Sequence, residues 1–343
     1  MQKTVTFGIA AYNAEKYLDK CLSSFLCGEV LEQIEVLVIN DGSSDRTEQI
    51  AKSFEEKYPG VFRVISQENK GHGGALNTAV SQAAGKYFKP VDADDWIVTE
   101  NLPRYIKCLE KTEVDVVINS YHTINLTNGK TQAFSVESAK CGVPISIEEL
   151  AECYSEIAPC CSFHGITYHT GFYQNIGFHL TEKVFYEDNE YAIIPFFHAE
   201  TVMLLPFYFY EYQIGNGEQS VAFHNQVKRI GHLETVIQAI LSYQKLHDWK
   251  TPGGKAYYYQ KFSTVVVSYY AIAFVKNPNK KEGRRQAEQF YCRIEASDPL
   301  LNKTASKKIQ TLRLFNRLHF PASQYERIMS TSFYKAIRRL WIK

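Results

Sequence analysis

The sequence predicts an α/β fold, in which a mostly parallel sheet carries helices on both faces, with an all-helical C-terminal extension. Two observations support this prediction. Over the first 120 residues, apolar runs alternate with helical patterns, as expected for parallel strands joined by crossover helices. From about residue 225 onward the pattern is helical, interrupted at proline and glycine positions. We therefore expect a first domain over residues 1–222 and a helical region over residues 223–343.

Each element of the first domain follows from the spacing of its apolar residues. Apolar runs predict strands over residues 5–10, 34–39, 61–65, 87–91 and 114–119. Helical spacing predicts helices over residues 14–26, 45–57, 74–84 and about 101–111. A hairpin centred on Asn128-Gly129 is expected next. Beyond it we expect helices over 147–155 and from near Glu187, and strands over 202–205 and 207–212.

Composition excludes several classes of protein. The chain has 343 residues, of which 45% are hydrophobic and 14% aromatic, so it can bury a large core and is not disordered. No leader resembling a signal peptide opens the sequence, and no apolar run is long enough to cross a bilayer. The eight cysteines form no CxxC pair, which predicts reduced thiols. A cytoplasmic location is therefore expected.

Charge is distributed unevenly along the chain. Residues 276–343 contain 16 Lys and Arg against 5 Asp and Glu, a net charge of +11, whereas residues 1–275 carry −10. Such a basic tail suits an anionic surface, and we expect peripheral contact with an anionic membrane at its inner face. Alternatively, the tail is a solvated helical face or docks on the acidic body. No nucleic-acid partner is expected, because no recognised nucleic-acid-binding module accompanies the charge.

The strongest motif is Asp92-Ala93-Asp94-Asp95, which follows the expected strand 87–91 directly. Ligands bind at the carboxyl ends of strands in open parallel sheets. Two carboxylates one residue apart can point into the same cleft, where they repel each other unless a cation neutralises them. Oxygen ligands of this kind suit Mg²⁺ or Mn²⁺ shared with a phosphate group. The alternative is an acidic turn that caps a helix.

Two further motifs follow strands and could contact a nucleotide. Asp41, in Asp41-Gly42-Ser43, lies at the tip of a strand, where its carboxylate can accept hydrogen bonds from a base or a ribose. Tyr12, in Ala11-Tyr12-Asn13, offers a flat ring on which a base could stack. Turn and capping chemistry fully explains residues 43–47 but explains Asp41 less well, and an aromatic residue at a strand end is more often part of the core.

The remaining motifs are a glycine-rich segment and an acidic pair. Residues 69–75 contain three glycines, which let backbone approach a ligand closely, and Lys70 with the following helix start favours anions. A flexible turn is the alternative. Glu187-Asp188 stands at an expected helix start, where one carboxylate could act as a general base. Acidic residues in a first helical turn are also ordinary partners of the helix dipole.

The order of these motifs resembles the family 2 glycosyltransferases, which have the GT-A nucleotide-sugar-binding fold. The resemblance is close over residues 3–100 and fair to about residue 215. One departure is Ala11, which stands where many members have proline.

The resemblance implies a role for each motif. Tyr12 would lie against the nucleobase and Asp41 would bond its edge, while Asp92 and Asp94 would contact ribose and a divalent metal, Mn²⁺ or Mg²⁺. The implied donor-binding residues are Ala11, Tyr12, Asn13, Asp41, Asn69, Lys70, Gly71, Ala75, Asp92, Ala93 and Asp94. Asp188 would be the catalytic base, with Asp95 and Glu187 on the acceptor side. His224 follows a stretch resembling a segment that closes over the diphosphate, and is a candidate metal or phosphate ligand.

The expected activity is therefore inverting, metal-dependent transfer of a sugar from a UDP-sugar to a hydroxyl of a glycan or lipid-linked acceptor. Cell-surface polysaccharide assembly is the process that the resemblance suggests. A non-catalytic nucleotide-sugar-binding protein of the same fold is the alternative. A nucleotidyltransferase is a third hypothesis, but Asn13-Ala14-Glu15-Lys16 fits its triphosphate loop poorly. An oligomer is compatible with the sequence.

Overall fold

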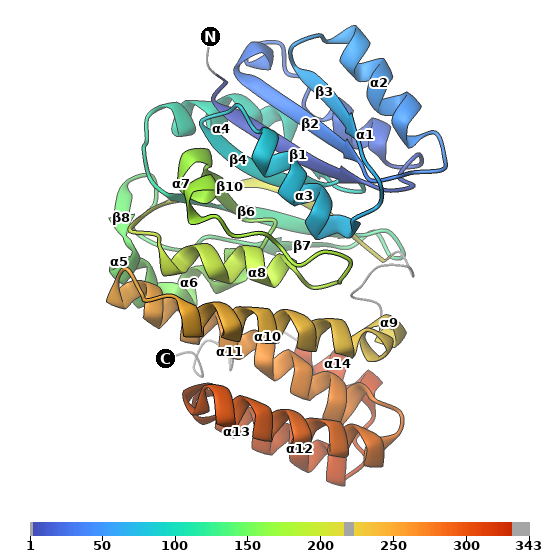
Figure 1. Cartoon of the computed structure of the whole chain (residues 1–343), viewed down its shortest axis with the longest axis vertical. Coiled ribbons are helices and arrows are strands. Elements are labelled where there is room, and N and C mark those ends of the chain that lie inside the picture. Colours follow the sequence, from blue (N-terminus) through green and yellow to red (C-terminus); the bar gives the residue numbers. More distant parts are fainter. Residues whose placement is uncertain (1–2, 216–222, 331–343) are drawn as a thin grey trace.

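The computed structural model describes residues 3–215 and 223–330. Within these residues, ten strands form one sheet, whose main order is β3-β2-β1-β4-β9-β6-β10-β5. Figure 1 shows the beginning of this order, with β3, β2, β1 and β4 side by side. Four parallel strands make its first half: β1 (Val5–Ala11), β2 (Ile34–Asn40), β3 (Phe62–Ser66) and β4 (Tyr87–Asp92). The parallel arrangement expected from the alternating pattern holds for this half.

The second half of the sheet is mixed. Strand β9 (Ile166–His169) runs antiparallel between β4 and β6 (Val116–Asn125), and β10 (Thr201–Ile214) runs parallel to β6. The short strands β5 (Trp96–Ile97), β7 (Thr131–Phe134) and β8 (Pro144–Ser146) complete it. The two strands expected on either side of Pro206 are one strand, β10, whose register with β6 shifts between Leu205 and Tyr210. Proline cannot donate a ladder hydrogen bond, which accounts for the irregularity there.

Helices cover both faces of the sheet. Alternate side chains of β2 belong to two different apolar clusters, because successive side chains of a strand point to opposite faces. Helices α1 (Leu18–Ser23), α2 (Thr47–Lys57) and α4 (Leu102–Glu110) contribute to the larger cluster. Helix α3 (Gly71–Gln82) lies on the other face, where Ala75 and Ala79 pack with Leu37, Ile39 and Phe88.

Two helix starts differ from the expected positions. Helix α1 begins at Leu18 rather than near Ala14, because residues 15–17 form a turn in which the Tyr17 N–H donates to the Ala14 carbonyl. Helix α3 begins at Gly71, so the glycine-rich segment forms its first turn instead of a loop. The hairpin at Asn128-Gly129 is confirmed: Gly129 has a φ of 67° and its N–H donates to the Asn125 carbonyl.

The rest of the first domain consists of short helices. The α-helices are α5 (Ile147–Glu152), α6 (Tyr154–Ile157), α7 (Thr170–Ile176) and α8 (Asp188–Ile193), and the 3₁₀ turns are Leu31–Gln33, Thr99–Asn101, Ala158–Cys160 and Ile194–Phe197. Helix α8 begins one residue after Glu187, as the sequence predicts.

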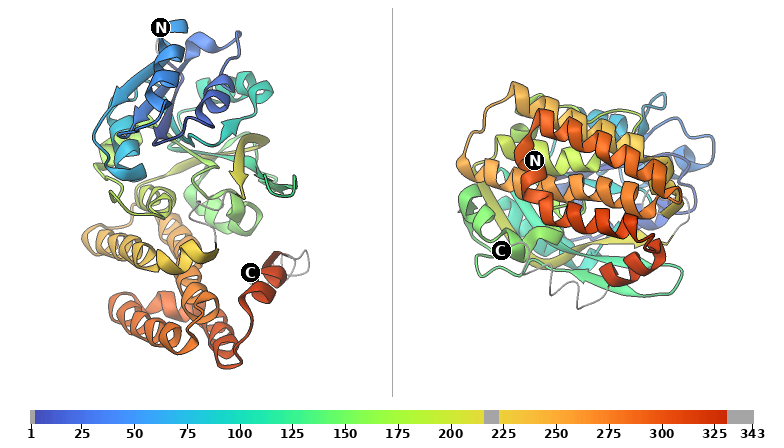
Figure 2. Two further views of the ribbon diagram at one scale, coloured as in Figure 1. Left: turned by 90° about the vertical axis from the view of Figure 1, so that its right-hand side faces the viewer. Right: turned by 90° about the horizontal axis from the view of Figure 1, so that it is seen from below.

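The described part of the C-terminal region, residues 223–330, is helical and lies beneath the sheet (Figure 2). Its helices are α9 (Phe223–Lys228), α10 (Ile230–Leu246), α11 (Pro252–Ala271) with a π-helical end (Ile272–Lys276), α12 (Lys280–Ser297), α13 (Pro299–Arg317) and α14 (Ala322–Ser330). Their apolar cluster also includes Ile193, Ile194 and Phe197, and Tyr257 stacks on Phe196 with ring centroids 3.8 Å apart. The helical region therefore packs directly behind α8. Within the described residues, no helix has both the length and the hydropathy needed to span a membrane.

Candidate active site

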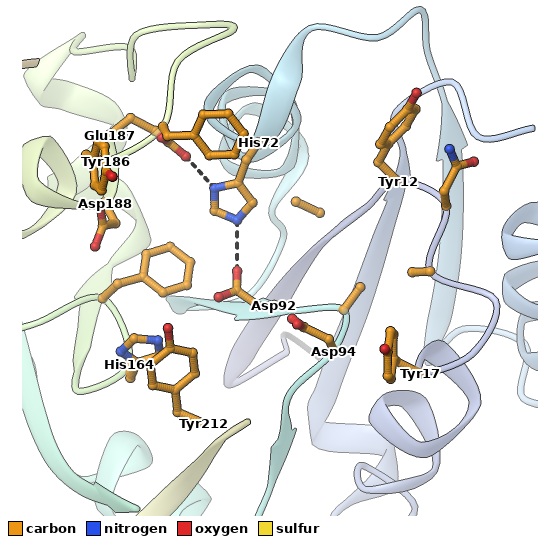
Figure 3. A pocket seen from close by; sticks show the side chains of 16 residues that line it. Tyr12, Tyr17, His72, Asp92, Asp94, His164, Tyr186, Glu187, Asp188 and Tyr212 are labelled. Atoms are coloured by element: carbon orange, nitrogen blue, oxygen red, sulfur yellow. Dashed lines mark hydrogen bonds and ion pairs between the residues drawn. The ribbon is translucent and has the colours of Figure 1, made fainter. Parts of the chain in front are cut away.

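A cavity of about 440 Å³ lies at the carboxyl ends of β1 and β4, with α8 on its far side (Figure 3). Its lining includes seven residues that the sequence singled out: Tyr12, Asn13, Asp92, Ala93, Asp94, Glu187 and Asp188. Asp92 and Asp188 are separated by almost a hundred residues of sequence, yet both carboxylates face this one hollow. Three of the acidic residues that the sequence singled out, Asp92, Asp94 and Asp188, therefore share one cavity, whereas Asp41 does not line it.

Tyr12 occupies the side of the cavity opposite α8 (Figure 3). The next residue, Asn13, has a φ of 49°, and its backbone N–H donates to Ser43 Oγ while its side-chain Oδ1 accepts from the Ser44 N–H. These bonds fix the turn that follows β1. They leave the Tyr12 ring 56% exposed, which is unusual for an aromatic side chain at a strand end.

The acidic turn after β4, residues 92–95, is hydrogen-bonded to β10. Asp95 is buried and accepts hydrogen bonds from Tyr210 Oη at 2.6 Å and from the Gln213 N–H at 2.7 Å. Burial, together with the carboxylates of Asp92 and Asp94, raises its pKa well above the usual range. Asp95 therefore anchors the turn beneath the cavity, while Asp92 and Asp94 line it.

His72 links the two acidic parts of the site, and the sequence did not single it out. Its Nε2 lies 2.9 Å from Asp92 Oδ1, and its Nδ1 lies 2.6 Å from Glu187 Oε1. Burial opposes the charged imidazole, but the hydrogen bonds to both carboxylates outweigh it and raise the pKa of His72 well above its usual value. The only sequence signal was its place inside the glycine-rich segment.

Asp188 is the first residue of α8 and is half-buried in the cavity wall. Burial and the neighbouring Glu187 carboxylate raise the pKa of Asp188 to about 6. Its Oδ1 accepts a hydrogen bond from Asn189 Nδ2 at 3.1 Å. A carboxylate in this state is ionised at neutral pH and is a stronger base than a solvated aspartate.

The other predicted donor-binding residues do not line the cavity. Asp41 is buried, and its Oδ1 accepts from Gln67 Nε2 and from the Lys70 N–H, while Asn69 Nδ2 donates to the Asp41 carbonyl. These bonds shape the loop between β3 and α3, which leads into Gly71. Two alanines belong to the core instead, Ala11 at the end of β1 and Ala75 on the buried face of α3.

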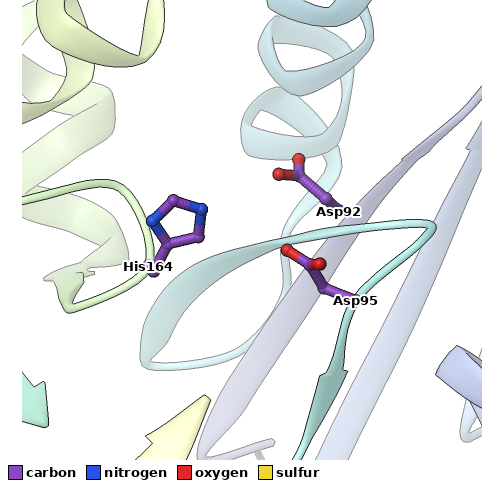
Figure 4. A group of neighbouring side chains, drawn as sticks. All are labelled: Asp92, Asp95 and His164. Carbon is purple, nitrogen blue, oxygen red and sulfur yellow. The ribbon is translucent and has the colours of Figure 1, made fainter. Parts of the chain in front are cut away.

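His164 is a second site residue that the sequence did not indicate. Asp92, Asp95 and His164 each offer one ligand atom, and these atoms lie within 4.8 Å of one another (Figure 4). The buried Nδ1 of His164 has no hydrogen-bond partner among the described residues, and burial lowers the pKa of this imidazole to about 4. It is therefore neutral, as a metal-ligating histidine must be. The side chain of the other histidine candidate, His224 in α9, lies outside the described residues.

Comparison with known proteins identifies the family. The model of Glycosyl transferase family 2 matches residues 6–177, half of the chain. The chain belongs to this family. Among the curated relatives of this family 2 chain, GlyA of Streptococcus pneumoniae is 34% identical over 125 residues, 36% of this chain and 18% of its own length. EpsH of Bacillus subtilis is 36% identical over 130 residues, 37% of this chain and 36% of its own length. The matched stretches thus span about a third or less of these two relatives.

Solved structures show that this family 2 protein has the GT-A fold. Residues 1–349 of S. aureus TarS in complex with UDP-GlcNAc superpose with a TM-score of 0.67 at 18% identity, covering 94% of this chain and 92% of that TarS fragment. The mannosyltransferase PcManGT of Pyrobaculum calidifontis, in complex with GDP-Man and Mn²⁺, superposes with a TM-score of 0.55 at 16% identity. It covers 100% of this chain and 88% of that one.

Proposed function

We propose that this protein is an inverting glycosyltransferase that moves a sugar from a UDP-sugar to an acceptor hydroxyl with the help of a divalent metal. The observation that carries the proposal is the shared cavity. Tyr12 stands on one side, Asp92 and Asp94 stand at the floor, and Asp188 stands on the other side. A nucleotide-sugar lying across the floor has its base at one end and its sugar at the end next to a carboxylate base.

The donor end of the cavity supports a nucleotide. The exposed Tyr12 ring provides a stacking surface for a flat base. TarS was solved with UDP-GlcNAc and with UDP, and PcManGT with GDP-Man. The uracil base is the donor base that we propose here. In this proposal, Asp41, Asn69 and Lys70 act at the donor end, through the loop that they organise.

Asp188 is the group that we propose activates the acceptor. Its pKa of about 6 leaves it ionised at neutral pH, ready to accept the proton of an acceptor hydroxyl. The acceptor oxygen then bonds to the anomeric carbon as the bond between that carbon and the diphosphate oxygen breaks, and UDP leaves. One base facing the leaving group across the sugar produces a single in-line displacement, which inverts the anomeric centre.

The residues at the cavity floor fit a divalent metal. Asp92 and Asp94 offer carboxylate oxygens, and one imidazole nitrogen of the neutral His164 lies within 4.8 Å of an Asp92 carboxylate oxygen. A bound Mg²⁺ or Mn²⁺ would neutralise negative charge that develops on the leaving diphosphate. Asp95 fits less well as a ligand, because Tyr210 and Gln213 already occupy both of its oxygens.

Release of UDP tests the assignment. The wild-type protein is supplied with UDP-Glc, UDP-Gal, UDP-GlcNAc or UDP-GalNAc, with and without Mn²⁺, and UDP is measured. We expect Asp94→Ala and Asp188→Ala each to reduce turnover at least about a hundredfold. The exposed Asp248 provides the control variant Asp248→Ala, which should match wild type. Turnover at the wild-type rate in both site variants would refute the assignment of these two residues. If the wild-type protein bound a donor but released no UDP, the non-catalytic alternative would be favoured.

The basic tail provides a surface that we propose contacts an anionic membrane. Residues Leu300, Lys303, Lys307, Leu314 and Leu318 are exposed, and their spacings of three, four and seven place them on one face of α13 and its end. Leucines that enter a headgroup layer beside lysines that attract anionic lipid are typical of interfacial helices. This contact would bring the enzyme to a lipid-linked acceptor in cell-surface polysaccharide assembly.

Vesicle sedimentation tests this surface. Wild-type protein should bind vesicles containing phosphatidylglycerol and be released by salt, since exposed charges are screened. Leu314→Ser with Leu318→Ser should weaken binding severalfold, whereas Leu246→Ser, an exposed leucine on α10, should not. If the double variant bound vesicles as well as Leu246→Ser, or if wild-type protein bound neutral vesicles equally well, this face of α13 would be excluded as the membrane contact.

A further inference from the structure

The glycine-rich start of α3 contacts another segment of this chain rather than open space. A Cβ added to Gly71 would lie 2.9 Å from the Lys183 backbone nitrogen, and one added to Gly73 would lie 2.6 Å from the Thr181 carbonyl oxygen. Gly71 also has a φ of 76°, and the Lys183 N–H donates to the Lys70 carbonyl at 3.1 Å. The glycines therefore allow α3 to contact the backbone of residues 180–187.

Two side chains of α3 extend this contact. Asn77 makes a pair of hydrogen bonds with Leu180: its Nδ2 donates to the Leu180 carbonyl at 2.9 Å, and its Oδ1 accepts from the Leu180 N–H at 2.8 Å. At the other end of the segment, His72 bonds Glu187. Helix α3 therefore holds both ends of residues 180–187, the stretch that leads into Asp188.

The imidazole of His72 bridges two acidic side chains. Its Nε2 faces Asp92 Oδ1 and its Nδ1 faces Glu187 Oε1, both at hydrogen-bond distance. The Glu187 side chain is buried, with 5% of its surface exposed, and the centroid of the Phe163 ring lies 5.5 Å from that of the imidazole. Without the His72 imidazole, the buried Glu187 carboxylate would be unpaired and would be repelled by the Asp92 carboxylate.

We propose that His72 is a positioning residue, which sets the distance between the donor side and the acceptor side of the site. Its Nε2 holds Asp92 at the cavity floor, and its Nδ1 holds Glu187, which places Asp188 at the start of α8 (Figure 3). This inference rests on the proposed function. Because a misplacement of about 1 Å can reduce a rate about a hundredfold, such a link would act on the rate of transfer.

Two amide variants separate the two bonds. An asparagine amide reaches the position of Nδ1, so His72→Asn keeps a donor for Glu187 and removes the one for Asp92. A glutamine amide reaches the position of Nε2, so His72→Gln does the reverse. We expect His72→Gln to lower kcat about tenfold or more with donor KM nearly unchanged, and His72→Asn to raise donor KM with a smaller loss of kcat. The exposed, remote His319 supplies the control variant His319→Asn.

Hydrogen–deuterium exchange gives a measurement that does not need turnover. We expect amides of residues 180–193 to exchange faster in His72→Gln than in wild type, and to stay protected in His72→Asn. Absence of UDP release by wild-type protein would overturn the proposed function, and the exchange pattern would still test the contact. Equal kinetic effects of the two variants, or equal protection of residues 180–193 in both, would overturn the positioning role of His72.

Discussion

Replacing Gly73 by alanine tests how closely α3 packs against residues 180–187. The new Cβ would lie 2.6 Å from the Thr181 carbonyl oxygen and 3.1 Å from Glu187 Cγ. Ordinary van der Waals contact begins at 3.4 Å, so the Thr181 oxygen must move by roughly 0.8 Å. Thr181 cannot move freely, because its N–H and its hydroxyl both donate to the buried Glu190.

The change in the free energy of unfolding caused by Gly73→Ala is the sum of two opposing contributions. Overpacking in a close contact costs about 1–3 kcal/mol. Alanine in a helix recovers about 1 kcal/mol relative to glycine. We therefore expect Gly73→Ala to lower the free energy of unfolding by up to about 2 kcal/mol. Turnover should fall further, by about ten- to a hundredfold, because the displacement reaches Glu187 and the start of α8.

Urea denaturation and UDP release measure the two effects separately. Gly231→Ala is the matched control: Gly231 is also near a helix start, and a Cβ there meets no atom within 4 Å among the described residues. It should leave turnover unchanged and stability unchanged or slightly higher. If Gly73→Ala were as stable and as active as this control, residues 181–187 could not lie against α3 as described.

Three further predictions concern other parts of the molecule. Because the base that we propose, Asp188, has a pKa of about 6, kcat/KM should fall about tenfold between pH 7 and pH 5, and Asp188→Asn should abolish this dependence along with most activity. Burial lowers the pKa of Lys89 to about 7, so between pH 7 and about 10 the unfolded chain binds one proton more than the folded chain. The free energy of unfolding should therefore rise with pH over this range. Lys89→Met should remove this pH-dependent increase, as measured by urea titrations at pH 7 and 9. Tyr12→Ala should raise donor KM about tenfold at similar kcat, while Tyr12→Phe should not, and equal KM values would exclude base stacking.

Much of the first domain could be predicted because the signals are local. Strands β1 to β4 and helices α2 and α4 lie within two residues of their expected bounds, since alternation of apolar and helical patterns depends only on neighbours in sequence. The mixed half of the sheet could not be predicted in the same way. Strand β9 is four residues long and pairs between β4 and β6, which are distant from it in the chain.

The glycine-rich segment shows the limit of sequence patterns most clearly. Its three glycines predict a close approach of backbone to something, and the structure shows that this partner includes residues 181–183. A pattern of small residues indicates that space is needed but does not say what fills it. The contacts of His72 could not be predicted for the same reason, since its two partners, Asp92 and Glu187, are 20 and 115 residues away in the sequence.

The sequence by itself determined which acidic residues stand at the ends of strands and helices, because strand and helix boundaries follow from short-range periodicity and capping chemistry. Only the tertiary structure decided that Glu187 and Asp188 face Asp92 and Asp94 across one cavity, and that His72 and His164 belong with them. Those relations depend on how α3, α8 and β10 pack against one another. Packing of this kind is set by contacts between residues far apart in the chain, which no local pattern encodes.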